Sequence, residues 1–277
     1  MMIEIGKINL LRVVKFVDFG AYLDGAEFGE ILIPKRYIPE NLAVDDMISV
    51  FIYTDSEDRI IATTEMPFAM VGNFAYLKVV SINKVGAFLD WGLTKDLLVP
   101  FNEQKQTLEL DKSYIVYVFL DKLTNRVAAT TKIDKYLDVE PVEYEPGDIV
   151  NILIHSQTDL GYKVIVESKH WGVIYENEVF RSLKRGQHLT AYIKKIRDDG
   201  KIDLSIDKPG FEKIDDLTEK IIEKLKTNKG FIGVTDKSSP ETIYGVFGAS
   251  KKTFKKAIGA LYKKRIINIS EEGIHLL

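Results

Sequence analysis

An internal repeat constrains this chain more than any other feature of its sequence. The string Gly-Ala-Tyr-Leu-Asp at residues 20–24 recurs as Gly-Ala-Phe-Leu-Asp at residues 86–90, after 66 positions. Two more segments match in the same order: Ile31–Pro34 with Leu97–Pro100, and Arg59–Thr64 with Arg126–Thr131, the last pair with one residue inserted. Three matches in one order indicate that the first half of the chain holds two copies of one structural unit.

A third and more diverged copy begins after Gly147. Its segments keep the same order, at residues 150–154, 161–166, 172–175 and 201–205. Between the second and third copies, residues 136–146 hold four carboxylates and two prolines. This composition predicts a stiff acidic linker between two folded units.

Each copy has the pattern of a small β-domain. Short apolar or alternating runs are separated by Gly, Pro, Asn and Asp, and β-branched and aromatic residues are enriched within the runs. Several strands within about 65 residues favour a closed barrel, because closure pairs every strand edge. We therefore expect one barrel per copy, over residues 1–66, 67–135 and 147–207.

Residues 208–277 change to a helical pattern. A first amphipathic helix is indicated by Ile214, Leu217, Ile221, Ile222 and Leu225 on one face. Ser239 before Pro240 predicts the capped start of a second helix, and Ser250 after the Gly248–Ala249 turn predicts the start of a third. With a closing hairpin at residues 266–269 and 274–277, these helices predict an α+β winged-helix domain.

The third helix is predicted to be amphipathic and basic. Its apolar stripe comprises Phe254, Ala257, Ile258, Leu261 and Tyr262, and its other face comprises Lys251, Lys252, Lys255, Lys256 and Lys263. No acidic residue occurs from Thr242 to Ser270, so phosphate contact is the expected use. A solvated charged face and a protein-binding winged helix remain open alternatives.

The charge balance limits how nucleic acid can be bound. The net charge is −3, but residues 1–207 sum to −8 and residues 208–277 to +5. An acidic majority argues against broad coating by phosphate, so a nucleic-acid site has to be a local patch or a stacking surface. Residues 67–135 form the only copy with a positive balance, nine basic against seven acidic side chains.

Composition and motifs argue against catalysis. The absence of cysteine excludes disulfides and thiolate chemistry, and the four histidines show no metal-like spacing. Phosphate loops, zinc-protease helices and nucleophile elbows have no match in the sequence. We therefore expect a protein that is not an enzyme and needs no metal or other cofactor. No signal peptide or membrane-length apolar run is evident, which favours a cytoplasmic protein without a membrane partner.

The first copy resembles the S-one RNA-binding domain. The resemblance rests on Gly6–Lys7 before an apolar strand, Asp18–Tyr22 with its Asp-Phe-Gly-Ala-Tyr string, Gly29–Pro34, and Asp55 with Arg59 before a last strand. Three such copies and a basic winged helix resemble the conserved virulence factor B family over essentially the whole chain. The resemblance implies five-stranded barrels of the OB-fold type, RNA binding and a regulatory role that includes virulence-type genes.

The sequence departs from the S-one pattern at several positions. Proline stands at positions 34 and 100, where the pattern has a histidine, and Val85 replaces the first aromatic residue in the second copy. Phe19 and Tyr22 flank the small residues Gly20 and Ala21, which we expect to leave room for a base to stack. The alternative is that both rings are ordinary core or rim residues of a strand.

The candidate RNA-binding residues are aromatic and basic side chains of the repeated β-domain motif and of the basic third helix. They are Lys7, Lys15, Phe19, Tyr22, Arg59, Lys84, Phe88, Arg126, Tyr162, Lys163, Lys251, Lys252, Lys255 and Lys256. The leading hypothesis is a post-transcriptional regulator whose barrels hold single-stranded RNA and whose winged helix adds backbone contacts. The alternatives are a transcription regulator that binds duplex DNA through the winged helix, and a scaffold for ribosomal or polymerase proteins.

Overall fold

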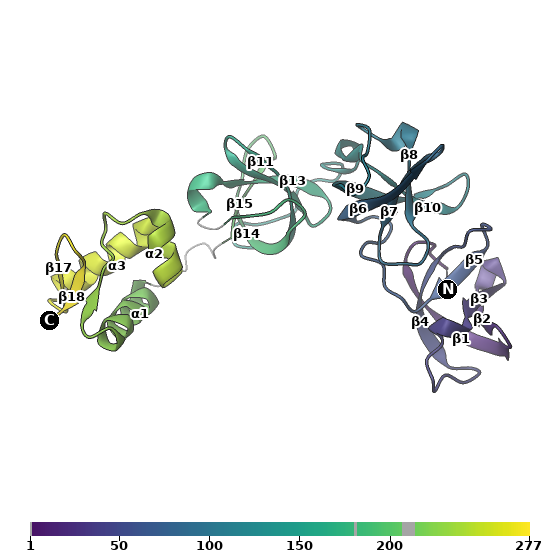
Figure 1. Ribbon diagram of the computed structural model, residues 1–277, viewed down its shortest axis with the longest axis horizontal. Coiled ribbons are helices and arrows are strands. Elements are labelled where there is room, and N and C mark those ends of the chain that lie inside the picture. Colours follow the sequence, from purple (N-terminus) through teal and green to yellow (C-terminus); the bar gives the residue numbers. More distant parts are fainter. Residues whose placement is uncertain (1, 180–181, 207–213) are drawn as a thin grey trace. The chain divides into compact units, whose positions relative to one another are not determined.

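The computed structural model describes residues 2–179, 182–206 and 214–277 (Figure 1). The chain divides into two compact units, Met1–Glu140 and Pro141–Leu277. The first unit holds two β-domains, and the second holds a third β-domain and a helical domain. In the described part of the chain, every helix is too short or too polar to cross a bilayer.

The first β-domain is a closed five-stranded barrel. Its strands are β1 (Ile8–Val17), β2 (Gly20–Asp24), β3 (Glu30–Pro34), β4 (Met47–Thr54) and β5 (Ile60–Thr63), in the order β1-β2-β3-β5-β4. Two short 3-10 helices, η1 (Ala26–Phe28) and η2 (Lys35–Tyr37), flank β3. Alternate residues of the strands, such as Val13, Leu23 and Ile33, fill the core, as the period of a pleated strand requires.

The second β-domain is a half-barrel whose sheet does not close, whereas a closed barrel was expected for this copy. Its strands are β6 (Phe74–Asn83), β7 (Gly86–Asp90), β8 (Leu97–Pro100), β9 (Ser113–Asp121) and β10 (Arg126–Thr130), in the order β10-β9-β6-β7-β8. β8 is only four residues long and runs into η3 (Phe101–Glu103). The carbonyl of Glu103 in η3 accepts hydrogen bonds from Thr130 Oγ1 and Thr131 N, each at 3.0 Å, which hold η3 against the end of β10.

The third β-domain is again a closed barrel. Its strands are β11 (Ile149–Thr158), β12 (Gly161–Val166), β13 (His170–Tyr175), β14 (His188–Ile196) and β15 (Ile202–Ser205), with η5 (Glu176–Glu178) after β13. The order β11-β12-β13-β15-β14 repeats that of the first barrel. A register shift interrupts the first hairpin at the same place in each copy, between Val13 and Lys15, Val79 and Ser81, and Ile154 and Ser156. The three copies therefore share one fold down to a β-bulge.

The predicted acidic linker, residues 136–146, is mostly exposed but is attached at each end to the domain beside it. After η4 (Ile133–Tyr136), the Tyr136 ring stacks on Tyr117 of β9 with centroids 3.8 Å apart, and Leu137 is buried. Val142 and Tyr144 pack against the core of the third barrel. Apolar and aromatic side chains thus hold both ends of a segment whose carboxylates and prolines suggested a simple spacer.

Residues 214–277 form the predicted winged helix. Its elements are α1 (Ile214–Thr227), β16 (Phe231–Ile232), α2 (Pro240–Phe247), α3 (Lys251–Lys263), β17 (Ile267–Ile269) and β18 (Ile274–Leu276). Ser239 and Ser250 cap α2 and α3 by accepting hydrogen bonds from the backbone N–H groups of Thr242 and Thr253, as expected. The two-residue β16, which joins the hairpin as a third strand, was not predicted.

The apolar faces of the winged helix differ from the prediction at one residue. Leu217, Ile221 and Leu225 of α1 and Phe254, Ala257, Ile258 and Leu261 of α3 form the core. The side chain of Ile214, also expected on this face, lies outside the described residues. Tyr262 was assigned to the apolar stripe of α3, but its side chain is 53% exposed. Position 262 lies at the edge of that stripe, where one helical step decides whether a ring is covered.

The first two β-domains pack against each other within the first unit. Phe51 and Tyr53 of β4 belong to the same buried cluster as Trp91, and the rings of Phe51 and Trp91 meet edge to face with centroids 5.6 Å apart. Lys95 reaches from the second domain to donate hydrogen bonds to the carbonyls of Thr54 (2.9 Å) and Asp55 (2.7 Å). The junction is therefore an apolar core beside which the partly buried cation of Lys95 is satisfied by backbone oxygens.

Candidate nucleic-acid interface

The first barrel presents an exposed aromatic ring, paired with a partly exposed one, beside a cation. Phe19, in the turn between β1 and β2, is 59% exposed, and its ring meets that of Tyr22 on β2 edge to face, with centroids 6.4 Å apart. The strand register places Lys15 opposite Tyr22, and Lys15 Nζ lies 4.9 Å from the centre of the Tyr22 ring. This arrangement exposes the flat, apolar ring of Phe19 and places a cation over the neighbouring Tyr22 ring.

The small residues between these rings have structural roles, which corrects the expectation that they leave room for a base. Ala21 is fully buried in the barrel core. A Cβ at Gly20 would lie 2.2 Å from the carbonyl oxygen of Ile33, so glycine is required there by the close approach of β2 and β3. The candidate stacking surface therefore depends on the exposure of Phe19 and Tyr22 alone.

Most candidate cations of the first barrel are balanced by carboxylates. Lys15 pairs with Glu30 at 2.6 Å, and Arg59 pairs with Asp55 at 2.7 Å and with Glu57 at 2.9 Å. Burial acts to raise the pKa of Asp55, but hydrogen bonds from the Arg59 side chain and nearby backbone outweigh it and hold that pKa below its ordinary value. Lys7 is only partly exposed, close to Gly72 of the second domain. Charge alone therefore does not mark this barrel as a phosphate site.

The second domain has a more apolar version of the same face. Phe88 occupies the position of Tyr22, and Ser81 stands opposite it, where the first barrel has Lys15. Exposed apolar side chains occur at the end of β6, in the turn after it and at the start of η3, those of Ile82, Val85 and Phe101, and Lys84 is exposed in the same turn. This surface can stack or bury a base but contributes fewer charges.

Arg126 lies at the junction of the first two domains. Its guanidinium forms a close ion pair with Asp58 of the first barrel. The hydrogen bond from Arg126 is the main cause that lowers the pKa of Asp58 below its ordinary value. The structure therefore brings Arg126 to an interdomain contact and not to the face that carries Phe88.

In the third barrel, Lys163 takes the position that Tyr22 has in the first. Lys163 lies opposite Ser156 and its Nζ is 3.5 Å from the centre of the Trp171 ring, so a cation covers one face of the largest nearby aromatic group. Tyr162 is only 9% exposed and belongs to the core, which corrects its assignment as a stacking residue. Counting in steps of two from the turn glycine, Gly161, would have placed Lys163 outward and Tyr162 inward.

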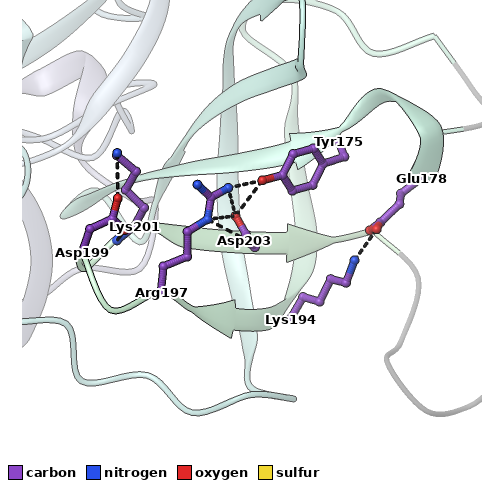
Figure 2. A network of polar contacts seen from close by, with 7 residues as sticks. All are labelled: Tyr175, Glu178, Lys194, Arg197, Asp199, Lys201 and Asp203. Atoms are coloured by element: carbon purple, nitrogen blue, oxygen red, sulfur yellow. Dashed lines mark hydrogen bonds and ion pairs between the residues drawn. The ribbon is translucent and has the colours of Figure 1, made fainter.

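The outer face of this barrel also carries a polar network that the sequence analysis missed. Arg197, just after β14, donates to both carboxylate oxygens of Asp203 on β15, at 2.7 to 3.1 Å, and to the hydroxyl of Tyr175 on β13 (Figure 2). Two further ion pairs flank it, Lys194 with Glu178 and Lys201 with Asp199 (Figure 2). The available signal was the alternation of Asp203 between buried Ile202 and Leu204, which directs its carboxylate outward.

The third β-domain therefore satisfies much of its own polar surface. Its prominent cations contact carboxylates or an aromatic ring of the same barrel. Opening such contacts to admit a ligand would expose charges that now have partners, which costs binding free energy. Binding of a nucleic acid to this face is therefore expected to cost more free energy than binding to the Phe19–Tyr22 pair of the first barrel.

The winged helix separates positive and negative charge on its surface. Lys252, Lys255 and Lys256 of α3 are exposed, and Lys251 is partly buried. Lys255 Nζ lies 3.6 Å from Asp236. The turn between β17 and β18 instead carries the exposed carboxylates of Glu271 and Glu272. The basic surface thus belongs to α3 and not to the hairpin.

Comparison with known proteins agrees with this arrangement of domains. The S1 domain family matches residues 5–65 and 71–132, and the CvfB-like winged helix domain family matches residues 219–276. This confirms the resemblance to the conserved virulence factor B family. The third barrel lies between the matched segments and shares their strand order and bulge. The matched families are nucleic-acid-binding domains and not families of enzymes.

The similarity to conserved virulence factor B extends over nearly the full length. The protein of that name from Staphylococcus aureus is 28% identical, over 98% of this chain and 94% of the relative. Its counterpart from Staphylococcus saprophyticus is 26% identical over the same shares. A solved multidomain protein with nucleic acid binding domains from Streptococcus pneumoniae is 23% identical over 99% of this chain and 98% of the other, with a TM-score of 0.43.

Proposed function

We propose that this chain is a cytoplasmic regulatory protein that binds single-stranded RNA and acts after transcription. In this proposal the barrels stack bases and the winged helix contacts the RNA backbone. The observation that carries it is the edge-to-face pair of exposed Phe19 and partly exposed Tyr22, with Lys15 beside it. Aromatic stacking suits an acidic protein, because it binds unpaired bases without requiring a broad positive surface.

The charges of the winged helix favour contact with the phosphate backbone of a nucleic acid over recognition of bases in a duplex groove. Lysines are point charges that fit phosphate, whereas bidentate reading of bases uses Arg, Asn or Gln. The exposed carboxylates of Glu271 and Glu272 at the hairpin turn oppose close contact between the wing and phosphate. We therefore favour attachment through α3 without base-specific recognition.

The proposal is tested by removing the aromatic pair. The full-length Phe19→Ala, Tyr22→Ala variant is expected to bind mixed-sequence single-stranded RNA about tenfold to a hundredfold more weakly, since each stacked base contributes about 1–3 kcal/mol. Fluorescence anisotropy with labelled RNA gives the Kd. Phe28→Ala is the matched control, because Phe28 is another exposed ring of the same barrel, on η1.

Two results would contradict the proposal. If the folded double variant binds RNA as tightly as the parent, the first barrel does not stack bases. If duplex DNA competes better than single-stranded RNA and shows a steeper salt dependence, a DNA-binding regulator is favoured instead. Absence of any salt-dependent nucleic-acid binding would favour a scaffold for ribosomal or polymerase proteins.

A further inference from the structure

Helix α3 contains an interior glycine that the fold of the domain does not require. Gly259 is the ninth of 13 residues and has ordinary helical backbone. A Cβ built at Gly259 meets no atom within 4 Å. Neither a left-handed φ nor a close neighbour therefore explains the glycine, which is among the least favourable residues in a helix interior.

The surroundings of Gly259 on the helix surface are basic. Residues three and four positions away are the surface neighbours of a helical residue. For Gly259 these neighbours are Lys255, Lys256, Tyr262 and Lys263, and all four side chains are exposed. The partly exposed backbone of Gly259 thus lies among three cations, of which Lys255 also contacts Asp236 at 3.6 Å, and one exposed aromatic ring.

We propose that Gly259 is the point where α3 comes closest to the phosphodiester backbone of a bound nucleic acid. The inference rests on the proposed nucleic-acid binding by this domain and adds the residue that sets the contact distance. Charge complementarity identifies the occupant, because residues 242–270 contain no acidic side chain. Without a side chain at position 259, a nucleic-acid strand lies against the helix backbone and stays within reach of the lysines on both sides.

A side chain at position 259 has two opposite effects in this arrangement. It stabilises α3, because every common residue except proline has a higher helix propensity than glycine. It also holds the nucleic-acid strand away from the helix, which lengthens several lysine–phosphate contacts at once. Greater stability with weaker binding is therefore the signature of a close-approach site, and a purely structural glycine would not produce it.

The test compares two substitutions in the full-length protein. Gly259→Ala is expected to raise the unfolding midpoint of the winged helix by about 3–6 °C. The Kd for mixed-sequence single-stranded RNA is expected to rise about threefold for Gly259→Ala and about tenfold for Gly259→Gln. A parallel titration with duplex DNA shows which nucleic acid occupies the site, since both present the same phosphodiester chemistry.

Gly245→Ala in α2 is the matched control. Gly245 is also a helical glycine whose Cβ would meet nothing within 4 Å. Its neighbour four residues earlier is Glu241, so its surface is not basic. The control is expected to gain stability with unchanged affinity for both probes.

The inference is overturned if both Gly259 variants bind single-stranded RNA and duplex DNA as tightly as the parent. A Lys252→Gln, Lys256→Gln variant then separates the causes. If this variant has lost affinity, the winged helix binds nucleic acid but Gly259 is not the point of closest approach. If it also binds normally, the contribution of the winged helix to the proposed function is wrong as well.

Discussion

Tyr53 shows how the packing of one side chain sets its chemistry. It lies on β4 at the junction of the first two domains and is almost fully buried. Burial is the main cause that raises the pKa of Tyr53 to about 12, because the phenolate would lose its hydration. The neutral phenol is therefore the form that the folded protein favours.

A raised pKa at Tyr53 predicts a loss of stability in alkali. The contribution is present in full below the pKa of an unfolded tyrosine, about 10, and is lost as the pH rises through the folded value. Urea unfolding of the parent and of Tyr53→Phe, compared at intervals from neutral pH upward, should show a stability difference that shifts in favour of Tyr53→Phe above about pH 10. A difference that stays constant with pH would contradict the raised pKa.

Phe19 and Gly20 illustrate how adjacent residues serve different purposes. Phe19 is exposed and meets Tyr22 edge to face, so the rest of its ring is available to a ligand. Gly20 is fixed by the carbonyl of Ile33, so it serves the sheet. Within one short string, the glycine accounts for the fold and the aromatic residue for the proposed function.

At the scale of elements, β4 connects the first two domains. Its second half is buried on both faces, because one face lines the first barrel and the other, through Phe51 and Tyr53, meets Trp91. Lys95 completes the contact, and burial lowers its pKa. Because one strand contributes to two cores, we expect the first unit to unfold cooperatively.

Trp91→Ala tests this coupling between the domains. Truncating a buried tryptophan typically costs about 3–5 kcal/mol, and here the cavity would open beside β4 of the first barrel. Hydrogen exchange measured by mass spectrometry should show lost protection in β4 as well as in β7. Phe101→Ala, which removes an exposed ring of the second domain, is the control and should change neither. Loss of protection confined to the second domain would show that the two fold independently.

At the scale of the whole molecule, the two proposed binding surfaces lie in different units of one chain. The aromatic surface belongs to Met1–Glu140 and the basic helix to Pro141–Leu277. Two weak sites on one chain gain affinity for a ligand that reaches both, because the second contact becomes intramolecular. Residues 1–140 have a net charge of −6, which suits stacking, and residues 208–277, which contain α3, have a net charge of +5, which suits phosphate contact.

This division predicts that affinity depends on RNA length. An RNA of about eight nucleotides matches the site size of a single barrel, whereas a longer RNA can also reach the winged helix. The Kd of the full-length protein should fall about tenfold or more between a short and a long RNA of mixed sequence. The Lys252→Gln, Lys256→Gln variant should lose this gain while its affinity for the short RNA stays the same. A gain that persists in the variant would argue against tethering through α3.

Much of the architecture follows from the sequence by itself. The repeat, the strand pattern and the capped helices at Ser239 and Ser250 predicted the β-domains and the winged helix, and the structure bears these elements out. These features are set by interactions over a few residues, such as strand alternation, a cap hydrogen bond or proline at the first helical position. The outward position of Lys163 was also within reach of the same alternation.

Only the tertiary structure decided how side chains from distant segments meet. The ion pair of Arg126 with Asp58 joins residues 68 positions apart, and the hydrogen bond from Thr130 to Glu103 joins β10 to η3 across 27 positions. The same holds for the network of Arg197, Asp203 and Tyr175 and for the exposure of Tyr262. Such contacts depend on the packing of whole strands and helices, which no local pattern specifies because propensity acts only along the chain.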